Sequence, residues 1–161
     1  FDFCNFDQTE LTVCAMVDCK LRRALFTGCM APGLDAQNTQ FSGLTCVKCV
    51  FDGSDLSRGS MAGAQLRECS FKEADLSRSD LSGSLIAACD VKGADMTMTK
   101  LAGANARDTE GFEELKACES AMIVGFVGVS PRARQLMKRQ GAKDGLERKK
   151  KDTGRFGRNS Y

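Results

Sequence analysis

The chain has 161 residues, with 23 Lys or Arg, 21 Asp or Glu, a net charge of +2 and no His. Without His it lacks the side chain that most often performs acid–base catalysis near neutral pH, and neither a glycine-rich phosphate loop nor a G-x-S-x-G motif occurs, so the sequence argues against an enzyme. No run of about 18 apolar residues occurs, which excludes a transmembrane helix of ordinary length.

Residues 1–110 carry an apolar column with a period of five. Of the 22 residues from Phe1 to Ala106 in steps of five, 18 are large and apolar. Two residues before each position of this column, at 4, 9, 14 and so on to 109, 20 of 22 residues are Cys, Ala, Ser, Thr or Gly. A period of five is neither the 3.6 of a helix nor the 2.0 of a strand, so the pattern indicates a solenoid.

Five segments carry a small residue, Asp or Asn, and an apolar residue in this phase: 54–56, 74–76, 79–81, 94–96 and 104–106. They resemble the core motif of the pentapeptide-repeat family. The resemblance covers about two-thirds of the chain and implies an all-β fold, a right-handed quadrilateral parallel β-helix with four pentapeptides per coil. Twenty residues per coil and a strand spacing of ~4.8 Å predict about 5.5 coils and a rod ~26 Å long. Chain ends of such a solenoid need caps.

The start of the chain and residues 31–45 depart from the ideal pattern. Phe1 is already in phase and no Met precedes it, so a leader segment has been removed or further N-terminal residues are missing from the sequence. The first coil lacks an evident cap, and either those missing residues or a partner would cover its open edge. At 31–45, Leu34 and Leu44 are large for the small position, while Ala31 and Ala36 underfill the axis. We expect a bulge or loop there, with the phase recovered at Phe41.

Four apolar residues fall at positions that the repeat normally makes polar. They are Leu25, Met30, Val47 and Val50. Either the 31–45 segment or the apolar stretch 121–129 covers them, or they form a docking patch for another protein.

Seven of the nine cysteines occupy the small inward position, and four of them are spaced 20 residues apart (Cys29, Cys49, Cys69, Cys89). We interpret them as buried, reduced packing thiols, because a straight column of thiols neither forms disulfides readily nor closes a tetrahedron around zinc. The same reasoning argues against a redox role for Cys46 and Cys49. Cys118 lies outside the repeat and is a candidate for a disulfide between tail and coil.

Four aspartates, Asp35, Asp55, Asp75 and Asp95, are predicted to stack as an outward ladder, with Arg58 and Arg78 placed to compensate their charge. A solvated corner is the simpler interpretation. A calcium site is the weaker alternative, because the ladder lacks a loop that converges oxygens on one ion. We predict no catalytic, cofactor or metal site.

Residues 111–161 are predicted to form a C-terminal helical cap and a basic extension. Asp108 or Thr109 could cap a helix running to about Ser120, and 121–129 would pack on the side of the solenoid. Ser130 and Pro131 have the pattern of N-cap and N1 of a second helix that ends near Gly141.

Charge divides the chain unevenly. Residues 1–110 carry a net charge of −4 and residues 111–161 a net charge of +6. We predict partner binding by the tail through six residues: Arg148, Lys149, Lys150, Lys151, Arg155 and Arg158. An acidic protein surface is the favoured target, with anionic lipid head groups as an alternative; nucleic acid fits less well, since only Phe156 and Tyr161 could stack on bases.

The sequence therefore predicts a non-catalytic interaction protein whose rod and tail dock onto a larger assembly. Within the family, its length, cysteines and C-terminal segment are similar to thylakoid-lumen members, which implies a subunit of a photosystem-type complex on the lumenal side of a chloroplast membrane. The alternative is the gyrase-protecting class, in which an acidic rod mimics DNA and binds a topoisomerase in the bacterial cytoplasm. The modest charge of this rod and its basic tail argue against that class.

Overall fold

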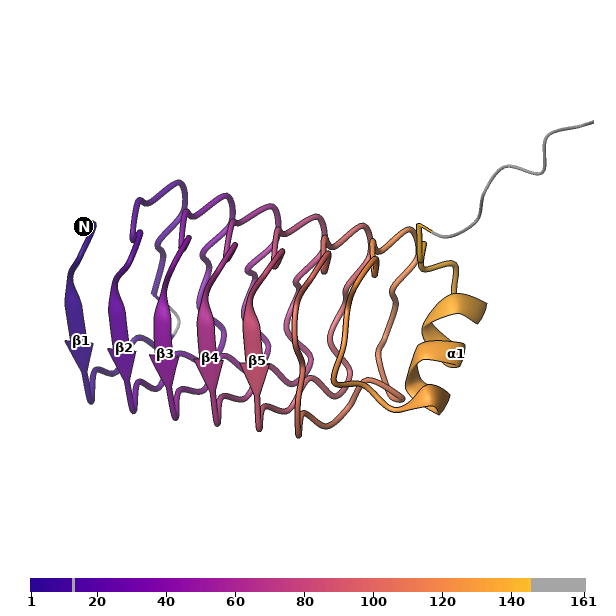
Figure 1. Ribbon diagram of the computed structural model, residues 1–161. Coiled ribbons are helices and arrows are strands. Elements are labelled where there is room, and N and C mark those ends of the chain that lie inside the picture. The colour runs from indigo at the N-terminus through magenta and orange to yellow at the C-terminus, as the bar shows by residue number, and fades with distance from the viewer. Residues whose placement is uncertain (13, 146–161) are drawn as a thin grey trace, which may run out of the picture.

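The chain winds into a parallel β-helix in the computed structural model, which describes residues 1–12 and 14–145 (Figure 1). Five short strands form one parallel sheet in chain order: β1 (Asn5–Asp7), β2 (Leu25–Thr27), β3 (Thr45–Val47), β4 (Gln65–Arg67) and β5 (Leu85–Ala87). Each strand residue pairs with the residue 20 positions later, and isolated bridges such as Ala15 with Asp35 keep the same step on the other sides of the coil. The predicted β-helix with 20-residue coils is confirmed. Coils are numbered here from the N-terminus, with residues 1–20 as coil 1.

The coil turns a corner at every fifth residue. Among the described residues, positions 3, 8 and 18, and then each fifth residue to 108, have φ between 49° and 70°. Many of these are not glycine; Arg58 and Met98, for example, both have φ 58°. Their amides are held in the ladder, donating to Ser77 O at 2.9 Å and to Glu119 O at 2.8 Å, which offsets the steric cost of this conformation for an L-residue.

The large residues fill the axis of the rod. Phe26, Leu66 and Leu101 are fully or almost fully buried. Phe6 and Phe26 stack with ring centroids 4.6 Å apart, and Phe51 and Phe71 stack at 5.3 Å. Because neighbouring coils share this core, each coil stabilises the next one.

The small inward residues have a second role that their size does not reveal. Ser54 Oγ donates to the carbonyl of Ala31 at 2.8 Å and accepts from the amide of Leu34 at 3.1 Å. Thr99 and Thr109 donate in the same way to carbonyls 23 residues back, each at 2.7 Å. Ser54, Thr99 and Thr109 therefore tie adjacent coils together through hydrogen bonds, whereas Ser79 and Ser84 at the same position donate to the carbonyl three residues back in their own coil.

The bulge or loop predicted for residues 31–45 is wrong. The 20-residue step continues through this segment, where Asp35 pairs with Asp55. Leu34 and Leu44 are both buried, and so are the smaller residues that follow them at the large positions of the same units, Ala36 and Cys46. Exchanging the large and small residues of a unit conserves the core volume, so the coil keeps its shape.

Pro32 also fits the regular coil. The equivalent amides of Arg22 and Lys72 make no ladder bond and instead donate to the side chains of Asp2 and Asp52, each at 3.0 Å. Proline at this position therefore removes no backbone hydrogen bond from the ladder.

The coil does not end at residue 110. Parallel bridges join Asp95 to Ala117 and Asn105 to Val127, so the step widens from 20 to 22 residues. The predicted helix over 109–120 is wrong: Asp108 is a corner residue with φ 55°, and Phe112 and Leu115 point into the core. Gly111 permits the wider turn, since a Cβ there would lie 2.3 Å from Lys92 N. The division of the chain into domains at 110 stays a prediction.

Residues 121–129 form part of the next coil instead of packing on the side of the solenoid. Met122 pairs with Lys100, and Ile123 and Phe126 are buried in the axis. Phe126 meets Phe112 edge to face with ring centroids 5.4 Å apart. The core thus continues under the C-terminal cap.

The helix α1 (Pro131–Arg139) covers the C-terminal end of the rod, as the Ser130–Pro131 signal predicted (Figure 1). Ser130 Oγ accepts from the amide of Ala133 at 2.9 Å, and Ala133 and Met137 are buried against the last coil. Arg134 donates to the carbonyl of Phe126 and to Asp144. None of the helices in residues 1–12 and 14–145 is long and apolar enough to cross a membrane.

Acid is expected to weaken this cap through Asp144. The Lys138 ammonium, 2.6 Å away, and the neighbouring Arg134 hold the pKa of Asp144 below its usual value. A carboxyl group whose pKa is lower in the folded state stabilises the fold at pH values above its unfolded-state pKa of about 3.9. This stabilisation is lost as the pH falls through the folded-state pKa. In urea titrations, Asp144→Asn should therefore be less stable than the wild type at pH 7, with a difference that shrinks below about pH 4. Asp18→Asn, an exposed site without an ion pair among the described residues, should show no such trend.

Candidate interaction surfaces

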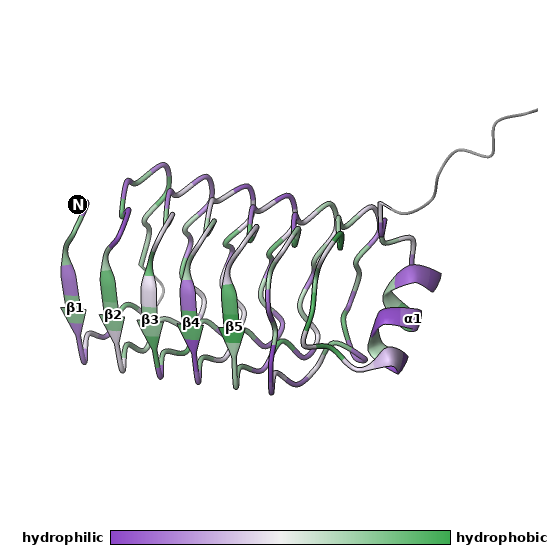
Figure 2. Ribbon diagram, viewed as in Figure 1, coloured by the Kyte–Doolittle hydropathy of each residue, from purple (hydrophilic) through white to green (hydrophobic). Residues whose placement is uncertain are grey.

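The four apolar residues singled out in the sequence lie together on the outside of coils 2 and 3. Leu25 is 37% exposed and Met30 48%, while Val47 and Val50 are half-buried. Met30 and Val50 are direct ladder partners, and Val47 pairs with Thr27, which lies two residues after Leu25 on β2. Figure 2 shows the change in character along the sheet, where β2 is hydrophobic and β1 is hydrophilic. We call these four residues the apolar patch.

Neither segment that was expected to cover the apolar patch does so. Residues 31–45 are part of the coil, and residues 121–129 form a coil at the other end of the rod. Exposed methionines and valines also occur near the C-terminal end, namely Met98, Met122, Val124 and Val127. The apolar patch is therefore an open surface among the described residues, as a docking site requires.

A groove of about 440 Å³ adjoins the apolar patch and crosses coils 3 to 6. Val50 belongs to both surfaces. The walls come from two columns: the corner residues Lys48, Glu68, Ala88 and Asp108, and the outward residues Val50, Ser70, Asp90 and Glu110. Cys49, Cys69 and Cys89 lie at its floor.

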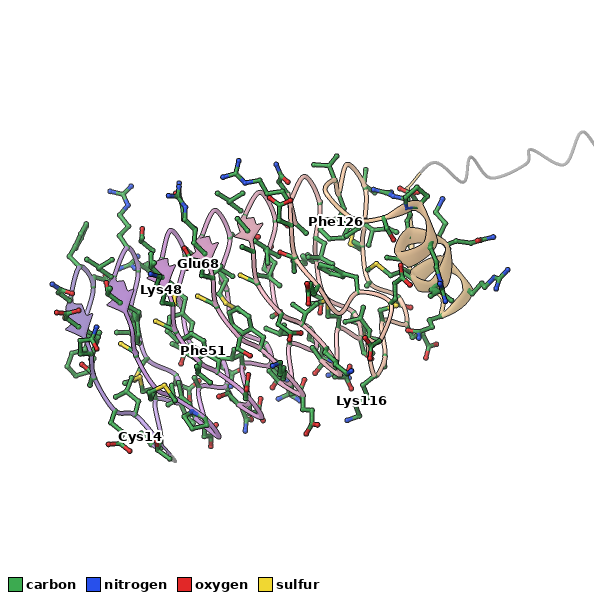
Figure 3. The ribbon with its side chains drawn as sticks, turned by 90° about the horizontal axis from the view of Figure 1, so that it is seen from below. Cys14, Lys48, Phe51, Glu68, Lys116 and Phe126 are labelled. Carbon is green, nitrogen blue, oxygen red and sulfur yellow. The ribbon has the colours of Figure 1, made fainter. Side chains whose placement is uncertain are left out.

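The charges of the groove are unequal along its length. Lys48 and Glu68, side by side in Figure 3, form an ion pair at 3.8 Å, and Lys72 reaches Asp90 at 3.2 Å. Asp108 and Glu110, in coil 6, make no ion pair within the part of the chain that the structure describes. The groove is thus acidic toward the C-terminal end of the rod and apolar toward the patch.

Sequence reasoning missed this groove. Writing the chain in rows of 20 would have aligned its two wall columns, but the depression between columns depends on how the corner turns. The predicted basic residues of the tail, Arg148, Lys149, Lys150, Lys151, Arg155 and Arg158, lie outside the described residues.

The aspartate ladder is a structural corner. Asp35, Asp55, Asp75 and Asp95 are ladder partners, as predicted. The carboxylates of the last three accept the amide two residues on, at 3.0, 2.8 and 3.0 Å. The ion pairs of the described residues include Lys116 with Asp95 but none from Arg58 or Arg78. Among the same residues no group of three acidic, Cys or His side chains is placed to hold a metal ion.

Replacing Asp75 should distinguish a corner role from a metal role. Asp75→Asn keeps the oxygen that accepts from Ser77 N and removes one charge of the ladder, so we expect a stability change within about 0.5 kcal/mol. Asp75→Ala removes the acceptor and should lower the free energy of unfolding by about 1 kcal/mol. Thermal denaturation with and without calcium checks this. A calcium-dependent rise in Tm that disappears in Asp75→Asn would contradict the corner role.

The cysteines follow the predicted column, with an exception in coil 1. All nine are free thiols. Cys29, Cys49, Cys69 and Cys89 are buried in one column, and Cys69 Sγ lies 3.6 Å from the Sγ of Cys46. Cys14, in contrast, is exposed, and Cys4 and Cys19 are half-buried, because coil 1 is packed on one side only. Cys118 lies under α1, where its thiol donates to Gln140 Oε1 at 3.1 Å.

Burial should rank the cysteines by reactivity. Pulsed alkylation of the native protein, read by mass spectrometry, should label Cys14 first and Cys4 and Cys19 more slowly. Burial also raises the pKa of Cys118 to about 11, which lowers its thiolate fraction. Six cysteines should react only after unfolding: Cys29, Cys46, Cys49, Cys69, Cys89 and Cys118. Rapid labelling of Cys118 in the folded protein would show that α1 does not cover it.

Comparison with known families identifies the repeat. The family model described as pentapeptide repeats matches residues 19–58 and 46–83, with eight copies. A search of curated proteins finds no match.

Solved structures with similarity to this chain include three of known source or role. QnrB1, a plasmid-mediated fluoroquinolone resistance protein, is 15% identical over 88% of this chain and 92% of its own, with a TM-score of 0.47. HetL of the cyanobacterium Nostoc, involved in heterocyst differentiation regulation, is 16% identical over 78% of this chain and 63% of its own, with a TM-score of 0.31. A pentapeptide-repeat protein from the Arabidopsis thaliana thylakoid lumen is 14% identical over 90% of this chain and 81% of its own, also with a TM-score of 0.31.

Proposed function

Because this chain is a pentapeptide-repeat protein, we propose that it is a non-catalytic interaction protein that docks onto another protein through the apolar patch. Proteins of this family are generally structural or interaction proteins. The observation that carries the proposal is the open position of Leu25 and Met30, 37% and 48% exposed beside Val47 and Val50 on a rigid side of the rod. A preformed apolar surface binds with little loss of conformational entropy.

The basic tail supplies a second contact in this proposal. Six Lys or Arg residues in 146–161 favour an acidic partner surface and would speed association at low salt. The partner class is therefore a protein with an apolar site next to acidic residues. A place in a thylakoid complex stays a prediction of the family resemblance.

Affinity purification of the tagged full-length protein from its native cells tests the proposal. Leu25→Gln with Met30→Gln should abolish recovery of the partner. A matched control, Met98→Gln with Met122→Gln, alters two exposed methionines away from the patch, 50% and 44% exposed, and should leave recovery unchanged. An identical set of co-purified proteins from both double variants would refute docking through the patch.

A further inference from the structure

We propose that the groove of coils 3 to 6 binds an extended segment of the partner protein, with an apolar side chain at Val50 and a Lys or Arg four residues away at Asp108 and Glu110. The proposal rests on the proposed function, because the apolar patch continues into the groove at Val50. It adds the conformation of the bound segment, its chemistry and the spacing of its two anchoring residues.

The charge of the groove differs between its two halves. Two lysines and one glutamate line it in coils 3 and 4, whereas the described residues that line it in coils 5 and 6 include three acids and no base. Lys72 reaches Asp90 at 3.2 Å, which leaves Asp108 and Glu110 without an ion pair in the described ranges. Both of these side chains are exposed. A cation is therefore attracted to coil 6 and repelled from coil 3, which fixes the end of the groove at which a basic residue binds.

The width of the groove selects an extended chain. Lys48 and Asp108 occupy one corner column and are three coils apart, so the groove is ~14 Å long. A volume of about 440 Å³ over this length gives a cross-section of roughly 30 Å². An extended chain that presents one row of side chains needs ~25 Å², half of the ~4.8 by ~10 Å that a strand takes in stacked sheets. A helix at least ~10 Å across needs ~80 Å² and does not fit.

Side chains, and not the backbone of the coil, must recognise this segment. The amides of Ser70 and Asp90 donate to carbonyls of the preceding coil at 2.9 and 3.0 Å, so the backbone under the groove is already used by the ladder. The segment therefore cannot bind by adding a strand to the sheet. Ser70 and Ala88 are small wall residues in the middle of the groove, which leaves room there for small neutral residues between the two anchors.

The length of the groove sets the spacing of the anchors. Val50 and Glu110 belong to one column and are three coils apart, ~14 Å. An extended chain advances ~3.4 Å per residue and points alternate side chains in the same direction. Residues four positions apart therefore span ~14 Å and both face the groove. At a separation of three or five, one of the two anchors points away from it.

Fluorescence polarisation with labelled ten-residue peptides and the full-length protein tests the proposal. Each peptide carries one Leu and one Arg in a Ser and Thr background, separated by three, four or five positions and in both orders. In titrations to about 0.5 mM protein, a separation of four should give binding at least about threefold tighter than the other two in one or both orders. This dependence on spacing distinguishes a seated extended chain from general attraction of a basic peptide.

Variants of the two ends of the groove locate the binding site. Asp108→Lys with Glu110→Lys should weaken binding of the best peptide by roughly tenfold. The coil accepts lysine at this corner, since Lys48 occupies the same column. Val50→Ser introduces the residue found one coil on in its column and should weaken binding by roughly threefold.

A charge control and circular dichroism accompany these variants. Glu73→Lys with Glu119→Lys makes the same change in net charge at exposed sites outside the groove and should alter binding by less than about twofold. Circular dichroism of each variant confirms that the rod is folded. Equal binding at the three spacings, equal losses in the two charge-reversed variants, or no binding up to the highest protein concentration would overturn the proposal.

Co-purification separates this proposal from the docking function on which it rests. If the partner is lost from the Leu25→Gln, Met30→Gln variant but retained by the Asp108→Lys, Glu110→Lys variant, docking through the apolar patch is correct and the role of the groove is wrong. Loss of the partner from both variants supports the groove as part of the docking site. Retention by both refutes docking through either surface.

Discussion

Phe26→Ala is expected to lower the free energy of unfolding by about 3–5 kcal/mol, the largest effect of a single substitution that we predict. Phe26 is fully buried and stacks on Phe6 with ring centroids 4.6 Å apart. Its ring also meets Phe41 at 6.3 Å and Phe51 at 6.5 Å. Removing the ring leaves a cavity that opens on three coils, and the repeating backbone cannot collapse locally to fill it.

Urea unfolding followed by circular dichroism measures this loss. Leu25→Ala is the matched control, since Leu25 precedes Phe26 on β2 but points outward and is 37% exposed; it should cost less than about 1 kcal/mol. Because each coil is stabilised by its neighbours, we also expect coils 1 to 3 of Phe26→Ala to unfold at a lower urea concentration than the remaining coils. Such a split transition would appear as a lower m-value. Equal losses in the two variants would contradict the axial packing described above.

Exchanging Leu34 and Ala36 is expected to preserve most of the stability, although each single substitution lowers it. Leu34→Ala should cost about 2–5 kcal/mol by opening a cavity, and Ala36→Leu about 1–3 kcal/mol by overfilling the axis. Both side chains are fully buried. In the double variant the unit returns to the ordinary order of small then large, so the two losses should largely cancel.

The reciprocal exchange provides the control for this cycle. Ala74 and Leu76 have the ordinary order and are equally buried. Ala74→Leu and Leu76→Ala should each destabilise, while the double variant should recover, because it reproduces the arrangement found at 34 and 36. Chemical unfolding of the seven proteins, with the wild type shared by the two cycles, gives both coupling energies. Additive losses at either unit would show that total volume does not decide whether a coil is tolerated.

The sequence predicted the parts of the fold that depend on the period. The five-residue phase indicated a solenoid, the resemblance to the pentapeptide-repeat family implied the four-sided coil, and the Ser130–Pro131 pair located the start of α1. The prediction for residues 31–45 was wrong because the small and the large inward positions of a unit were treated separately, although their summed volume determines whether the core is filled. The helix over 109–120 was misjudged because Phe112, Leu115 and Cys118 have helical spacing, yet the coil accommodates them with two extra residues and Gly111.

The candidate surfaces were predictable to different degrees. The outward direction of Leu25, Met30, Val47 and Val50 follows from the phase of the repeat and is confirmed; their role in binding stays a prediction. The phase of the repeat does not predict the groove, because the groove is a depression between the column of corner residues and the neighbouring column of outward residues. The hydrogen bonds of Ser54 and Thr99 were also hidden, since size alone explains a small residue at those positions.

The constant step of the ladder bears on how such a protein changes length in evolution. From coil 1 to coil 5 every ladder contact joins a residue to the one 20 positions away. A tandem duplication or deletion of 20 residues therefore restores every column, and the new neighbours meet the same kinds of surface that the old ones did. A change that is not a multiple of five residues rotates the inward residues out of the axis, and a change of 5, 10 or 15 residues keeps them inward but moves each column to another side of the coil. The 22-residue step after residue 95 ends this freedom, so growth and loss of coils should be confined to the part of the gene that encodes the region before it.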